Sequence, residues 1–178
     1  MLKTGQSAVK FALTLMLSFV LSTIVLSAQT EVTHQIGLQF SGISGHGLNY
    51  QLLVDRFGFE TSGYVFLEQE DQNDRLEFNI GTEVQYSLMR RDNIRTYGLI
   101  GINYHSLDET EFISLPGGGD SFERRNEDFT TGIGMGCEVV FFEHLALNLD
   151  LGYAYTNSDG GMYKETQAKG AVSVGYRF

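Results

Sequence analysis

Gly170–Phe178, with the sequence GAVSVGYRF, is the stretch that decides the fold. In an extended strand its large apolar side chains share one face: Val172, Val174, Tyr176 and Phe178. In water, an exposed apolar face and a free strand edge at the end of a chain would invite aggregation. The pattern is explained if the apolar face meets lipid and a neighbouring strand closes the edge.

The same alternation, with a period of two, extends back to residue 35. It predicts eight strands, over residues 35–41, 48–55, 57–66, 76–88, 95–105, 129–141, 145–155 and 170–178. The third of these changes phase halfway along, so we predict a β-bulge near Ser62–Gly63 that returns Tyr64 and Phe66 to the apolar face. The sequence therefore indicates an all-β chain, an eight-stranded antiparallel up-and-down transmembrane β-barrel.

Alternation alone does not fix which face points outward. A soluble barrel of the lipocalin kind would place the apolar face inside, around a greasy ligand. Two features favour the opposite arrangement. The polar face is rich in Gly, Ser, Ala and Asn, which suits a crowded lumen better than a solvated surface. Aromatic residues gather near the strand ends, as in the two interfacial girdles of membrane barrels; they are Tyr104, Phe129, Tyr153 and Tyr155 at one end and Tyr86, Phe141, Tyr176 and Phe178 at the other.

Connections of two lengths alternate along the chain. The turns after the second, fourth and sixth strands are very short, at residues 55–56, 90–93 and 142–144. The remaining connections are longer, at residues 69–75, 107–128 and 156–165, apart from a short Gly-rich turn after the first strand. Short periplasmic turns and longer external loops are typical of outer-membrane barrels. An even number of strands then places both termini in the periplasm.

The amino terminus has the features of a secretory signal peptide. Lys3 and Lys10 form a positive region, Phe11–Leu26 is apolar, and small residues precede a cleavage position after Ala28. An uncleaved anchor helix is disfavoured because the apolar run is shorter than the roughly 20 residues that span a bilayer. We therefore expect a signal peptide over residues 1–28 and one barrel domain over residues 29–178.

Over residues 31–178, the mature chain resembles the small eight-stranded outer-membrane protein β-barrel family, the group that includes OmpX and the membrane domain of OmpA. The resemblance rests on the strand pattern and the aromatic carboxyl terminus, whereas the absence of tryptophan departs from many relatives. It implies a monomer in the outer membrane of a Gram-negative-type bacterium, in contact with lipid and lipopolysaccharide. It also implies insertion by the barrel-assembly machinery, with Val174, Tyr176 and Phe178 as the C-terminal assembly signal, and no cofactor.

Composition excludes other classes of partner and bond. The formal net charge is −10, and it becomes −12 when Lys3 and Lys10 leave with the signal peptide. Such an acidic chain repels the phosphates of nucleic acid. Cys137 is the single cysteine, so no intramolecular disulfide can form.

The polar face also predicts what fills the barrel. An eight-stranded barrel has an interior just wide enough for its own side chains, and buried charges are normally paired. We expect a lumenal polar network made of Glu60, Glu77, Glu83, Arg95, Glu138, Asp150, Lys169 and Arg177. Arg177 is expected to pair with Glu138 or Glu83. The alternative is a narrow polar pore.

Catalytic and metal-binding patterns are weak. His105 and Ser106 lie near the predicted extracellular rim, but adjacent strand residues point to opposite faces and cannot form a nucleophile–base contact. No two of the four histidines share a ligand-like spacing. Asn157–Gly161 is better explained as a turn than as a calcium loop. We therefore predict no catalytic, cofactor-binding or metal-binding residues.

The external loops are where a specific function is expected. Residues 107–128 combine many acidic residues with the Arg124–Arg125 pair and the apolar side chains of Phe112, Ile113 and Leu115. The segment is either a solvated loop or a contact surface for an unknown extracellular partner. The sequence thus predicts an outer-membrane barrel with a structural or surface-interaction role and no catalysis. A small porin-like channel and a lipid A-modifying or lipid-handling barrel are the alternatives.

Overall fold

A computed structural model describes residues 32–70, 73–115, 118–158 and 164–178. The predicted signal peptide lies outside these residues, as do Pro116 and most of the Asn157–Gly161 turn. Within the described ranges, no helix has the length and apolar character needed to cross a membrane.

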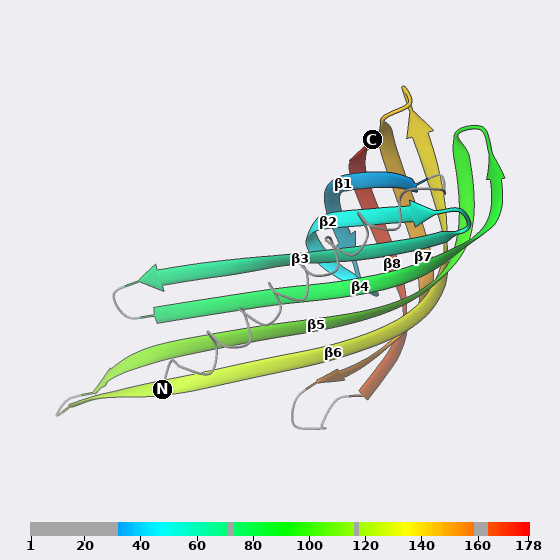
Figure 1. Ribbon diagram of the computed structural model, residues 1–178. Helices are drawn as coiled ribbons and strands as arrows, with labels where there is room; N and C mark the ends of the chain where they lie inside the picture. The colour runs from blue at the N-terminus through cyan, green and yellow to red at the C-terminus, as the bar shows by residue number, and fades with distance from the viewer. Residues whose placement is uncertain (1–31, 71–72, 116–117, 159–163) are drawn as a thin grey trace. The chain divides into compact units, whose positions relative to one another are not determined.

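The described chain forms eight antiparallel strands in a closed barrel, as the alternation predicted (Figure 1). The strands are β1 (Val32–Ser41), β2 (Gly45–Val54), β3 (Phe57–Glu70), β4 (Asn73–Arg91), β5 (Ile94–Leu115), β6 (Gly118–Phe141), β7 (Leu145–Ser158) and β8 (Lys164–Arg177). Each strand pairs with the next along the chain, and β8 pairs with β1 to complete the ring.

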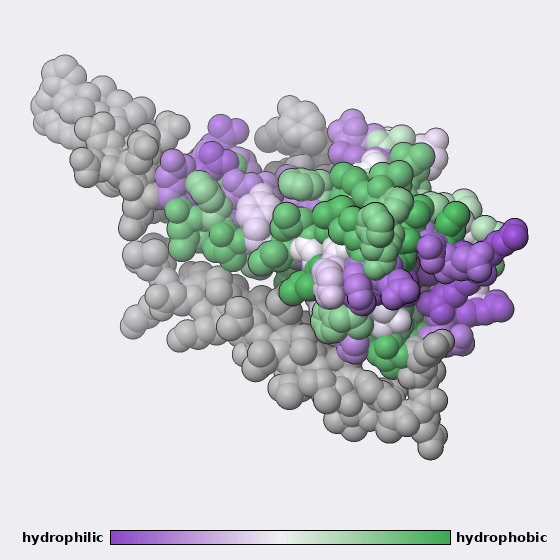
Figure 2. Space-filling view, turned by 90° about the horizontal axis from the view of Figure 1, so that it is seen from above, coloured by the Kyte–Doolittle hydropathy of each residue, from purple (hydrophilic) through white to green (hydrophobic). Residues whose placement is uncertain are grey.

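The barrel wall is apolar outside and polar inside, which confirms the predicted orientation of the faces. On β1, Ile36 and Phe40 are 53% and 64% exposed, whereas Gln39 between them is 1% exposed. On β8, Val174 is exposed and Ser173 is buried. Figure 2 shows the same arrangement from outside, with hydrophobic side chains gathered over the middle of the face in view and hydrophilic ones beside them. This polarity is the reverse of a soluble barrel and suits a hydrocarbon surrounding.

The connections that were predicted to be long loops are shorter than expected, because most of their residues continue the strands. Residues 107–128 were expected to form a loop, but β5 runs to Leu115 and β6 begins at Gly118. Figure 1 shows β3 to β6 extending well past the other strands. Opposite charges face each other across this extension, with Asp108 paired to Arg125 and Glu109 to Arg124. Charged residues stand at consecutive positions there, as at Asp108–Glu109 and Arg124–Arg125, so the strands carry no apolar alternation that could have revealed them.

The predicted bulge in β3 is wrong. The β3–β4 ladder runs without a register shift from Phe57↔Tyr86 to Glu70↔Asn73. Tyr64 therefore stays on the lumenal face, where its hydroxyl donates a hydrogen bond to the Glu77 carboxylate. That polar partner removes the need to turn the aromatic ring outward. The barrel's register shift lies instead between Ser87 and Met89 of β4.

The seam between the first and last strands fixes the carboxyl terminus. The backbone N–H of His34 donates to the Phe178 carbonyl at 3.0 Å, and the Phe178 N–H donates to the His34 carbonyl at 2.9 Å. The two rings stack with their centroids 5.7 Å apart. On the other side of β8, the Arg177 N–H donates to the His144 carbonyl at 2.6 Å. The final residues are thus bonded to both neighbouring strands.

Replacing the terminal ring is expected to weaken this seam. Phe178→Ala removes the stacked partner of His34 and an apolar contact worth about 2 kcal/mol. We predict a lower unfolding temperature in detergent, measured by heat-dependent gel mobility, and less barrel in the outer membrane. Phe129→Ala, which removes an exposed ring away from the seam, is the control. Equal membrane levels and unfolding temperatures for the Phe178 variant and the unchanged protein would contradict the prediction.

Candidate functional site

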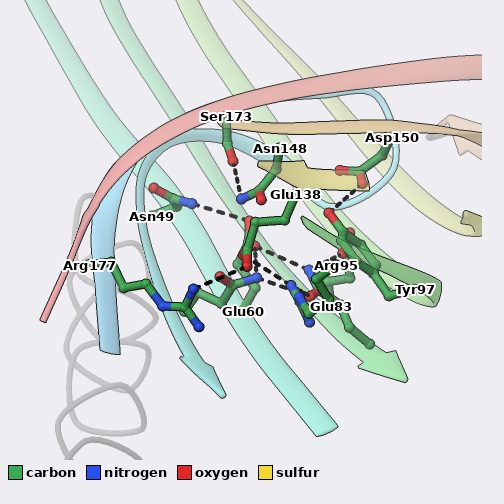
Figure 3. A network of polar contacts seen from close by, with 12 residues as sticks. Asn49, Glu60, Glu83, Arg95, Tyr97, Glu138, Asn148, Asp150, Ser173 and Arg177 are labelled. Carbon is green, nitrogen blue, oxygen red and sulfur yellow. Dashed lines mark hydrogen bonds and ion pairs between the residues drawn. The ribbon is translucent and has the colours of Figure 1, made fainter. Parts of the chain in front are cut away.

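The lumen holds a network of charges centred on Arg95 of β5 (Figure 3). The Arg95 Nη2 group donates to Gln85 Oε1 at 2.6 Å and to Glu138 Oε2 at 3.2 Å. Its guanidinium also lies 4.3 Å from the centroid of the Tyr97 ring. Arg177 Nη1 lies 3.7 Å from Glu138 Oε1, so Glu138 bridges two cations. Four strands, β4, β5, β6 and β8, are linked through these contacts.

The remaining buried carboxylates accept hydrogen bonds from neutral groups. Glu60 accepts from the side-chain amides of Asn49 and Gln51, both at 3.3 Å. Glu83 accepts from Gln85 Nε2 at 2.8 Å. The Tyr97 hydroxyl donates to Asp150 at 2.7 Å. Among the described residues, Glu60, Glu83 and Asp150 have no cation within ion-pair distance, so these neutral donors stabilise their carboxylates.

The predicted lumenal residues fall into three places. Glu60, Glu83, Arg95, Glu138, Asp150 and Arg177 lie in or beside the network around Arg95. Glu77 lies near the mouth from which the long strands extend, and Lys169 lies against the β1–β2 turn, where its side chain faces Gly42. Sequence reasoning concentrated on charges and overlooked the amides Asn49, Gln51 and Gln85. Their alternate positions on the polar faces of β2 and β4 were the available signal.

A second cluster of polar side chains surrounds Glu77, at the end of the lumen where β3 to β6 extend beyond the other strands. Arg75 Nη2 donates to Glu77 Oε2 at 2.8 Å, and His105 Nε2 lies 3.2 Å from Glu77 Oε1. His105 Nδ1 lies 3.7 Å from Asp128 Oδ2. The hydrogen bond from Tyr64, followed by those from His105 and Arg75, lowers the pKa of Glu77. The mouth therefore holds a charged carboxylate tied to three partners.

This mouth cluster does not assemble the groups of a nucleophilic enzyme. His105 contacts carboxylates on β4 and β6, while Ser106 follows it on the strand and therefore lies on the opposite face. Among the described residues, no group of three or more His, Cys, Asp or Glu side chains could hold a metal ion. The geometry supports an ion-paired rim.

The β1–β2 connection is a feature that the sequence analysis missed. It was expected to be a short Gly-rich turn between the first two strands. Instead, Ile43 is 0% exposed and packs with three lumenal side chains, Tyr97, Leu99 and Ala154. The turn therefore folds back into the barrel. The single apolar residue between glycines at 42 and 45 was the only sequence signal.

The barrel topology and its reversed polarity decide the fold type. Its fold is that of the small outer-membrane β-barrels. The N-terminal barrel domain of Pseudomonas aeruginosa OprF is 13% identical, with a TM-score of 0.42, and the match covers 83% of this chain and 96% of that one. Yersinia pestis Ail is 16% identical, with a TM-score of 0.41 and coverage of 83% and 95%, and a major outer membrane protein of Thermus thermophilus is 11% identical, with a TM-score of 0.46 and coverage of 83% and 99%. No family model and no curated protein matches the sequence.

Arg95 joins more members of the lumenal network than a single ion pair would, because it contacts Gln85, Glu138 and Tyr97. Arg95→Ala leaves Glu138 with one distant cation and removes a hydrogen bond from Gln85, so we expect a loss of about 3–5 kcal/mol of unfolding free energy. Urea unfolding of the barrel in lipid vesicles measures the change. The control is Arg91→Ala, because Arg91 lies 3.9 Å from Asp92 with both side chains largely exposed. An Arg95 variant as stable as the Arg91 variant would contradict a structural role for the network.

Proposed function

We propose that this chain is an integral outer-membrane barrel with periplasmic termini, and that its extracellular strands carry a surface-interaction role without catalysis. The exposed apolar side chains on the outer face support placement in a bilayer, since the ring of paired strands is also closed. The turns at one end are short, including Asp55 and Asp92 with positive φ values of 51° and 46°. The long hairpins all leave from the other end, which we assign to the outside.

The observation that carries the interaction role is the open edges of the projecting strands. The β2–β3 ladder ends at the Leu48↔Gly63 pair, although β3 continues to Glu70. The β6–β7 ladder ends at the Asp128↔Ser158 pair, although β6 extends outward to Gly118. Among the described residues, both outer edges of the β3–β6 extension therefore lack a strand neighbour. Such edges present main-chain donors and acceptors that can bind an extended segment of another protein.

Charge on the extension would determine which partner fits. Asp108 and Glu127 both contact Arg125, and Glu109 lies 3.9 Å from Arg75. Acidic residues outnumber the arginines on this extension, so the surface does not attract a polyanion. This pattern supports recognition through backbone pairing, with the ion pairs holding the strands extended.

Capture of an extracellular protein tests this proposal. Intact barrel is compared with a variant lacking residues 108–127 and with Val65→Lys/Leu67→Lys, which places lysines beside the open edge of β3, where Val65 and Leu67 are 51% and 71% exposed. Both variants should lose bound protein at least severalfold. Thr166→Lys, on β8 outside the extension, should retain it. Equal capture by all four barrels would remove the edge as the site, and capture of lipopolysaccharide alone would replace the protein partner.

Lipid analysis tests the absence of catalysis. Mass spectrometry of lipid A from cells with and without the gene is expected to give the same profile, because His105 is held between carboxylates and Ser106 lies on the opposite face of the strand. A new acyl pattern in the expressing cells would contradict the proposal and favour a lipid-modifying enzyme.

A further inference from the structure

The inward-folded β1–β2 turn, Ser41–Gly47, occupies the middle of the lumen. Ile43 and Ser44 are 0% and 1% exposed, although they belong to a connection between strands. Positive φ values at Gly45 and Gly47, 90° and 118°, allow the chain to reverse inside the barrel. The turn is therefore part of the interior.

The wall beneath the turn is made of glycines that leave room for it. A Cβ atom at Gly81 would lie 1.8 Å from the Ser44 carbonyl oxygen, which no side chain could tolerate. Cβ atoms at Gly132 and Gly152 would lie 2.8 Å and 2.9 Å from carbon atoms of Ile43. Because β4, β6 and β7 each contribute one of these glycines, the turn is seated against several sides of the barrel.

Hydrogen bonds hold the turn in that seat. The Ser62 hydroxyl on β3 donates to the Ser44 carbonyl at 2.7 Å. Gln39 Nε2 on β1 donates to Ser44 Oγ at 2.8 Å. The backbone N–H of His46 donates to Asn79 Oδ1 on β4 at 2.9 Å. Both the apolar tip and the polar backbone of the turn therefore have partners on the wall.

The seat lies between the two polar clusters of the barrel. Ile43 packs on Tyr97, whose hydroxyl reaches Asp150 in the network around Arg95. His46 bonds to Asn79, two residues along β4 from Glu77 in the mouth cluster. An ion moving from one cluster to the other would meet the buried isoleucine and its apolar neighbours.

We propose that the Ser41–Gly47 turn is a plug that closes the barrel to ions, and that its displacement opens a pore preferring cations. The preference follows from the lumenal charges, since the carboxylates Glu60, Glu77, Glu83, Glu138 and Asp150 outnumber the cations Arg95, Lys169 and Arg177. The inference rests on the membrane-spanning part of the proposed function. It is independent of any extracellular partner, so failed protein capture leaves it intact.

Planar-bilayer conductance is the first test, with barrels isolated from membranes of cells that express the full chain. Ile43→Glu places an unpaired carboxylate beside Tyr97 and Leu99 and should expel the turn, whereas Ile43→Val keeps the tip apolar. Gly81→Ala should expel it from the wall side. Gly98→Ala is its matched control, because a Cβ there would meet only the Gly134 carbonyl, at 4.0 Å. We expect steady cation-selective steps from Ile43→Glu and Gly81→Ala and none from the unchanged protein or the two controls.

Thiol labelling is the second test and does not depend on conduction. Ser44→Cys, in a Cys137→Ser background, should be protected from a membrane-impermeant maleimide, whereas Arg124→Cys on the exposed rim should react. Adding Gly81→Ala or Ile43→Glu should raise labelling at position 44 by at least about tenfold, because the turn then opens to water.

Steps from the expelled-turn variants alone, together with labelling at position 44, support the plug. Equal conductance of the unchanged protein and these variants would overturn it. So would barrels that label at position 44 and remain silent, because another element would then close the lumen. Rapid labelling of Ser44→Cys in the otherwise unchanged barrel would show that the turn does not occupy the lumen.

Discussion

Closure of the hydrogen-bonded ring is the constraint on which the structure depends. A backbone group left unpaired in hydrocarbon costs several kcal/mol, so a membrane sheet has to end where it began. Here the seam is the β1–β8 ladder, which runs from Gln35↔Arg177 to Ser41↔Ala171 and is extended by the His34–Phe178 backbone pair. The apolar outer face and the bonded carboxyl terminus can lie in hydrocarbon only because that closed ring pairs their backbone groups.

Closing a ring of eight strands creates a second constraint inside it. The enclosed space is narrow, and the side chains on the polar face must fill it. This chain divides the space between a charged network around Arg95 and a glycine-lined seat for the β1–β2 turn. The same crowding explains why neutral amides accompany the carboxylates, since Asn49 and Gln51 supply donors without bringing further charge.

The sequence predicted the barrel well where each strand has one polar and one apolar face. Alternation identified all eight strands and their orientation, because hydrocarbon on one side imposes a strict period of two. It failed where that contrast disappears. In the extension of β5 and β6, charged residues occupy consecutive positions, so the strand after Leu107 looked like a loop. Tyr64 suggested a bulge because an aromatic on the lumenal face was unexpected, and only the position of Glu77 across the ladder explains it.

The lumen shows a similar limit. Charged residues such as Glu138 and Arg177 could be assigned to the interior by parity alone, and the structure places them 3.7 Å apart. The position of the Gly-rich β1–β2 turn inside the lumen could not be predicted from the alternation of polar and apolar residues. Whether Ile43 points outward or inward depends on glycines more than 35 residues away, at positions 81, 101, 132 and 152. Only the folded ring brings these positions together.

The buried turn also imposes an order on assembly. Ile43 belongs to the first hairpin, yet it packs against residues of β5 and β7, which follow it by more than 50 and 100 positions. The last strand joins the first, so the enclosure is sealed only after the whole polypeptide has arrived. The hairpin tip must already lie within the curling sheet when the two ends zip together, or it must thread in afterwards through the outer opening. Assembly of this barrel therefore has to place the β1–β2 hairpin tip in the lumen as well as insert the strands into the membrane.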